Sequence, residues 1–264
     1  MSVATLDGIA AKIHRADEHI EYFDAEIARV LSENYRIATK FHSDSREYRF
    51  SAFGEAVAPL RLAVIVGEIA HQLRSALDHV VTQLHAVGPG GGDPAKLEFP
   101  ICLNPKRFAS ARKRGKITGV SESAAAAIED LQPYRTSTPP EHAALYVLHN
   151  LDRTDKHRVL HVVVACVQMA HTLKIDAKQD IHIERMSPPL PLGVRPSKDG
   201  TEIFTVTFGE KFDPDVNMEA DFTFQVTLDK LGTLEHLPAL PTLRQMRQVV
   251  VDNIRSQFFP DLSL

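Results

Sequence analysis

The sequence has no tryptophan and only two cysteines, Cys102 and Cys166, which lie far apart in its 264 residues. Two distant cysteines form no C-x-x-C pair, which argues against a disulfide framework or a zinc ribbon and fits a reducing cytosol. The longest apolar run, residues 159–170, contains a histidine and a glutamine and is too short to span a bilayer. Residues 1–13 lack the pattern of a signal peptide. We therefore expect a cytoplasmic protein with no membrane partner.

Several motifs of well-known enzyme classes are also missing. There is no G-x-S-x-G for a nucleophilic serine and no H-E-x-x-H for a zinc protease. The glycine-rich stretch 88–94 lacks the G-K-[ST] ending of a phosphate-binding loop. The chain has no basic excess, since 30 Lys and Arg face 34 Asp and Glu. Any nucleic-acid binding must therefore be local, and we expect no cofactor.

The first 158 residues are dominated by helical patterns. In residues 5–41, apolar side chains recur in steps of four and three, which predicts one long helix that packs against another helix, in the same chain or in a dimer. A second long helix is expected between Pro59 and Gly88, and shorter ones at 121–131 and 141–158. These elements predict a helical bundle over residues 1–158.

The hydrophobic period then changes. Residues 159–167 are rich in valine, and three segments alternate polar and apolar residues, namely 180–186, 201–208 and 220–228. Proline and Asp-Gly turn signals separate them, so we expect a small antiparallel sheet over residues 159–236. A last helix over residues 237–264 is expected to return to the bundle or the sheet. The fold class is therefore α+β, mainly a helical bundle with a small sheet in the C-terminal half.

One polar stripe interrupts the second long helix. His71, Arg74 and Asp78 are spaced three, four and seven residues apart, so they share a helix face. His79 is five residues from Arg74, and the two diverge by about 140° on a regular helix. The spacing thus pairs Arg74 with Asp78, unless a helix break or a second chain brings a histidine to it.

A second polar cluster lies in the last turns of the helix predicted over residues 141–158. Asp155 continues its apolar stripe and needs a partner, for which Arg74, Arg153 and Lys156 are candidates. Arg153 and His157 are four residues apart and are expected to share a face. The same cluster contains His149 and Asp152. Alternatively, the cations of the last turn only oppose the helix dipole.

The stretch Lys106–Lys116 is strongly basic and includes Lys113 and Arg114. Such a stretch could hold a phosphate backbone, although most charge runs are solvated loops.

Three chemistries can be built from these residue types. The first is metal-free RNA cleavage, with a histidine as acid or base and an arginine that stabilises charge on phosphorus. The second is a metal site, with candidate ligands His71, Asp78, His149 and Asp152, but no close ligand spacing supports it and we predict no metal. The third is no chemistry, with a charged network that fixes how the helices pack.

The element Arg74-Ser75-Ala76-Leu77-Asp78-His79 resembles the R-x4–6-H motif of the HEPN superfamily. Its members are helical bundles that often act as metal-independent ribonucleases in toxin–antitoxin and phage-defence systems. The resemblance implies a homodimer whose paired motifs form one cleft, with Arg74 and His79 as catalytic residues. In that site we expect Asp78 to orient the pair and His157 or Arg153 to assist.

A second resemblance spans roughly residues 60–160. The motifs Leu73–His79, Phe99–Ile101, Leu131–Tyr134 and Asp155–Arg158 occur in this order in a bacterial protein family, and this resemblance implies no activity.

These observations leave two functional hypotheses. The first is a HEPN-like ribonuclease or RNA-binding protein of the toxin or defence type. The alternative is a non-enzymatic binding or assembly module, in which Arg74, Asp78, Asp152 and Asp155 form a structural network.

Overall fold

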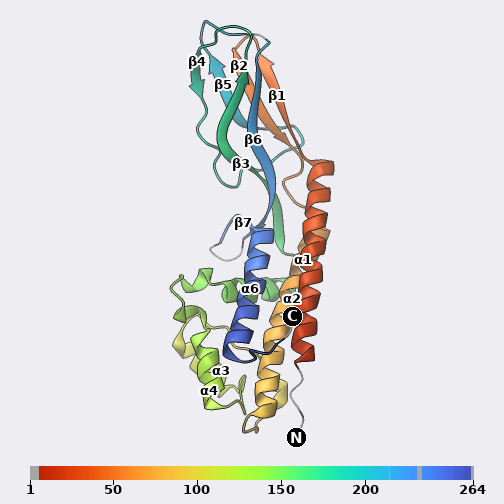
Figure 1. Cartoon of the computed structure of the whole chain (residues 1–264), viewed down its shortest axis with the longest axis vertical. Helices are drawn as coiled ribbons and strands as arrows, with labels where there is room; N and C mark the ends of the chain where they lie inside the picture. The colour runs from red at the N-terminus through yellow and green to blue at the C-terminus, as the bar shows by residue number, and fades with distance from the viewer. Residues whose placement is uncertain (1–5, 214, 231–233, 263–264) are drawn as a thin grey trace. The chain divides into compact units, whose positions relative to one another are not determined.

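The computed structural model describes residues 6–213, 215–230 and 234–262 (Figure 1). The chain divides into two compact units, and each unit combines segments that are distant in sequence. The first unit, called the helical unit below, holds residues up to Asp24, Leu60–His161 and residues from Lys230 onward. The second unit, the sheet unit, holds Ala25–Pro59 and Val162–Asp229.

The helical unit is built around α2 (Leu60–Val87), which packs against α5 (Ala144–Asp155) and α6 (Ala239–Gln257). Its large apolar side chains are fully buried, among them Leu62, Ile69, Leu73 and Leu77. The short helices α3 (Pro105–Lys113) and α4 (Glu122–Asp130) begin at the capping residues Asn104 and Ser121. Three 3-10 turns connect these elements, at Pro94–Lys96, Pro133–Arg135 and Pro140–His142.

The helix predicted over residues 5–41 is shorter than expected. Helix α1 covers Asp7–Asn34, and strand β1 follows at Arg36–His42. The Asn34 side-chain amide bonds to the Val30 carbonyl at 2.9 Å, in the last turn of the helix. Ile37 and Phe41 misled the prediction because a spacing of four residues also places two side chains on one face of a strand.

The sheet unit contains a four-stranded sheet in the order β1-β2-β5-β4, with antiparallel pairing. Its other strands are β2 (Glu47–Phe53), β4 (Ile183–Met186) and β5 (Thr201–Phe208). In a second sheet, β3 (His161–Asp176) neighbours β6 (Asn217–Asp229). An apolar core holds both together, with Tyr48, Phe50, Val206, Phe208 and Met218 buried. Strand β1 pairs with β2, and β2 pairs with β5. Residues 25–59, which were predicted to belong to the helical bundle, therefore lie in the sheet unit.

The α+β fold class predicted from the sequence is confirmed, and sheet strands also arise in the first half of the chain. The two-residue strand β7 (Leu237–Pro238) precedes α6, which packs on the helices α2 and α5. Among the described residues, every helix is too short or too polar to cross a membrane.

Candidate functional site

Arg74 lies at the centre of a hydrogen-bonded cluster in the helical unit. It is only 4% exposed, although its guanidinium is charged. Its Nη2 donates to the Phe99 carbonyl at 2.6 Å and to Glu98 Oε1 at 3.2 Å. Its Nη1 lies 3.1 Å from Asp78 Oδ1, yet it donates no well-aligned hydrogen bond to any described residue. The guanidinium therefore fastens the segment 98–99 onto α2.

Asp78 holds the same segment from its other side. Its Oδ1 accepts a 2.8 Å hydrogen bond from the Phe99 amide. Burial raises the pKa of Asp78, and the neighbouring Arg74 guanidinium opposes that effect. The predicted pair of Arg74 and Asp78 is thus present, and its geometry anchors a chain segment.

Glu98 links this cluster to the basic stretch. Its Oε2 accepts from Lys116 Nζ, while Oε1 faces Arg74. Burial acts to raise the pKa of Glu98, but the two cations outweigh it and lower the pKa overall. Glu98 is therefore a carboxylate at neutral pH, which keeps Arg74 and Lys116 in place.

Gln132 supports the next residues of the same segment. It is fully buried, and its Oε1 accepts from the Cys102 amide at 2.8 Å. Its Nε2 donates to the carbonyls of Pro100 at 2.8 Å and Ile128 at 2.9 Å. The segment 98–102 is thus tied down along its whole length.

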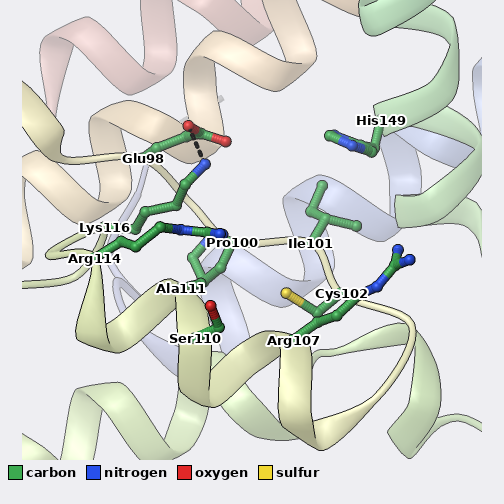
Figure 2. Close-up of a pocket in the computed structure, with 10 residues that line it drawn as sticks. All are labelled: Glu98, Pro100, Ile101, Cys102, Arg107, Ser110, Ala111, Arg114, Lys116 and His149. Carbon is green, nitrogen blue, oxygen red and sulfur yellow. Dashed lines mark hydrogen bonds and ion pairs between the residues drawn. The ribbon is translucent and has the colours of Figure 1, made fainter.

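Two hollows adjoin this segment. The first has a volume of about 340 Å³ and the second about 500 Å³. They share four lining residues, Glu98, Arg114, Lys116 and His149 (Figure 2). We call the first, beside Pro100–Cys102 and α3, the base hollow, and the second, beside α5, the acid-lined hollow, since it alone includes Asp78 and Asp152.

Positive charge dominates the two hollows together. Their lining includes seven cationic side chains, Arg74, Lys96, Arg107, Arg114, Lys116, Arg153 and Lys156, against three carboxylates. Among the described residues, no carboxylate pairs with Arg107, Arg114 or Arg153, and all three are exposed. Arg107 lines the base hollow, Arg153 the acid-lined hollow, and Arg114 both. Arg153 Nη2 donates to Asn150 Oδ1 at 3.2 Å, which leaves the charge of its guanidinium without an acidic partner. Guanidinium groups without carboxylate partners therefore line both hollows.

His149 of α5 stands at the border of the two hollows. Burial, with the nearby charges of Arg74 and Arg153, lowers the pKa of His149 to about 4. Its imidazole is therefore neutral at pH 7 and can accept a proton or a hydrogen bond.

The two other acidic residues predicted for the site, Asp152 and Asp155, differ in their burial and in their partners. Asp152 is buried and accepts from Lys156 Nζ at 2.7 Å, with His71 Nδ1 at 3.3 Å. Asp155 is exposed, and no described residue forms an ion pair with it, so the predicted partners were wrong. The reason is that α5 ends at Asp155 and its carboxylate packs against the α2 backbone at Gly67, a neighbour with no side chain to pair with it. Burial raises the pKa of Asp155.

Five predicted residues lie outside both hollows: His71 and Asp155, described above, and also His79, His157 and Lys113. His79 faces α1, where a Cβ placed on Gly8 would lie 2.7 Å from its Nδ1. Within one chain, Arg74 and His79 thus leave α2 on different sides. His157 is exposed beyond the end of α5, so it does not share a helix face with Arg153. Lys113 is exposed on α3, while its neighbour Arg114 lines the site.

Sequence reasoning missed Glu98, which lines both hollows, and Gln132, which supports the segment beside them. Arg107 and Lys116 were included only as part of the basic stretch Lys106–Lys116. Within the described parts of the chain, no group of three or more histidine, cysteine or carboxylate side chains could hold a metal ion.

Comparison with known proteins finds no family model, curated protein or solved structure that matches the chain.

Proposed function

We propose that this protein binds single-stranded RNA in the two adjoining hollows. The observation that carries the proposal is the placement of Arg107, Arg114 and Arg153, exposed and without acidic partners, along one continuous site. A guanidinium presents paired donors that fit phosphate oxygens. Three of them in sequence suit a ligand with repeated phosphates better than a single anion.

The paired cations have a different task in this proposal. Arg74 and Lys116 hold Glu98, and Lys156 holds Asp152, so they shape the hollows. The hollows are small pockets beside α3 and α5, which suit separate nucleotides of a flexible strand. The alternative of a purely structural network describes these paired residues well, but it assigns no ligand to the three arginines that lack acidic partners.

Neutralising the three arginines together, as Arg107→Gln, Arg114→Gln and Arg153→Gln, is expected to weaken RNA binding about a hundredfold at low salt. Each lost phosphate contact on a single strand should reduce the salt slope by about 0.7, so three lower it by about 2. Fluorescence anisotropy with a labelled oligonucleotide at several salt concentrations measures both quantities.

The matched control removes the same number of charges outside the hollows, as Lys106→Gln, Lys113→Gln and Arg158→Gln. All three residues are exposed, and none of them lines either hollow. The control should retain most of the affinity. Equal losses in the two triple variants would reject a specific site, and an unmodified protein that does not bind RNA would reject the proposal.

Metal-independent RNA cleavage is the second candidate, favoured by the position of His149, which lines both hollows together with Arg114 and Lys116. In this form, His149 takes the proton of a 2′-hydroxyl, and the 2′-oxygen attacks the adjacent phosphorus while an arginine stabilises the charge that develops there. The bond between phosphorus and the 5′-oxygen breaks, and the imidazolium returns the proton to that oxygen, which leaves a 2′,3′-cyclic phosphate and a 5′-hydroxyl. The HEPN-like form instead uses Arg74 and His79, and it needs a homodimer because the two side chains diverge within one chain.

If the protein cleaves RNA in the presence of EDTA, substitution separates these two forms. His149→Ala should slow cleavage about a hundredfold with RNA binding unchanged if His149 is the base. Loss of cleavage in His79→Ala, but not in His149→Ala, would favour the HEPN-like form. An intact protein that binds RNA and leaves it uncut would be a binding module.

A further inference from the structure

We propose that the base hollow holds one unstacked nucleobase, so that the site reads bases as well as phosphates. This inference rests on the proposed binding of single-stranded RNA. It assigns a ligand group to the hollow that has more apolar lining residues.

The floor of the base hollow is apolar and firmly held. It consists of Pro100, Ile101, Cys102 and Ala111, of which Cys102 is 8% and Ala111 2% exposed. Gln132 bonds to the main chain of both Pro100 and Cys102. A pocket that is already formed loses little entropy when a ligand enters, and an apolar floor favours a ring over a phosphate.

The rim of the base hollow offers planar groups and polar edges. Figure 2 shows His149 and Arg107 toward one side of Ile101, with Arg114 and Lys116 toward the other. Imidazole rings and guanidinium planes both stack on nucleobases. The Ser110 hydroxyl and the neutral His149 ring can meet the hydrogen-bonding edge of a base.

The volume of the base hollow and the position of Arg114 indicate where the base and the phosphate of one nucleotide would lie. About 340 Å³ is near the lower limit of small-molecule pockets and far exceeds the needs of one phosphate. Arg114 lines both hollows, so a phosphate bonded to it lies at their border. A base attached to that phosphate through its ribose would then enter the base hollow, and the strand would continue past Arg153.

The experiment compares ligands that differ only in the base. Binding of UMP, AMP and ribose 5-phosphate is measured by chemical-shift titration of the intact protein. At least one nucleotide should bind about tenfold more tightly than ribose 5-phosphate, since stacking of a single base gives differences of this size. An oligonucleotide with abasic positions should likewise bind more weakly than its parent.

A substitution at the rim tests the location. Ser110 is exposed and lines the base hollow, so Ser110→Phe should fill it and abolish the preference for nucleotide over ribose 5-phosphate. The control is Ala109→Phe, because Ala109 is exposed on the same helix and lines neither hollow. The control should keep the preference, and thermal melting checks that both variants are folded.

The outcomes separate this inference from the function on which it rests. If RNA binds through the three arginines but ribose 5-phosphate equals the nucleotides, the base pocket is overturned and RNA binding stands. A preference that survives in Ser110→Phe also overturns it. If the intact protein binds no RNA, the proposed function fails and the inference fails with it.

Discussion

Replacing Arg74 with methionine is expected to lower the free energy of unfolding by about 3 kcal/mol. This is the lower end of the usual cost of removing one partner from a buried ion pair, because the Asp78 and Glu98 side chains are 35% and 39% exposed. Methionine has a similar length but no donor. The Phe99 carbonyl would lose its 2.6 Å hydrogen bond, and Asp78 and Glu98 would lose a neighbouring positive charge. The unfolding equilibrium constant should rise about a hundredfold.

Urea unfolding followed by circular dichroism measures this change. The control is Arg114→Met, because Arg114 is exposed and has no acidic partner among the described residues, and it should shift stability by at most about 0.5 kcal/mol. Equal unfolding midpoints for the Arg74 variant and the unmodified protein would contradict the structural role. The result also governs the cleavage experiments, since loss of activity in an Arg74 variant has meaning only where the fold is intact.

The sequence predicted the long elements well where one periodicity had no competitor. Helix α2 was expected between Pro59 and Gly88, and it spans Leu60–Val87. Residues 36–42 failed because Ile37 and Phe41 satisfy the helical spacing and the strand spacing equally. Tertiary contacts decide between helix and strand in this segment. The ring centre of Phe41 lies 6.2 Å from that of Phe208 and 5.9 Å from that of Phe212.

The candidate site also has some contacts that the sequence predicted and others that it did not. The pair of Arg74 and Asp78 was predictable because both residues lie on one helix four positions apart. Glu98 is 24 residues from Arg74, and Gln132 is 30 residues from Cys102, so helical spacing says nothing about either contact. The available signal was weaker: the stretches Phe99–Ile101 and Leu131–Tyr134 stood out as motifs without a role. In the structure they meet, because Gln132 bonds to Pro100.

Replacing Gln132 with leucine is expected to destabilise the helical unit by about 3 kcal/mol, because two or three buried main-chain groups lose their partners at once. Leucine has nearly the same volume, so the loss reflects the hydrogen bonds to Cys102, Pro100 and Ile128 more than a cavity. Urea unfolding measures the change. Gln245→Leu is the matched control, since Gln245 is exposed on α6 and should tolerate leucine with little change.

The same variant tests whether the segment 98–102 must be held for the site to work. At temperatures where Gln132→Leu is still folded, the floor of the base hollow should be less ordered, so nucleotides should bind several-fold more weakly. Phosphate contacts through Arg153 lie on α5 and do not depend on this segment, so the salt slope of RNA binding should change little. If stability falls as expected but nucleotide binding is unchanged, Gln132 stabilises the unit without shaping the hollow. If neither the stability nor the nucleotide binding changes, the hydrogen bonds of Gln132 do not hold the segment 98–102 in place.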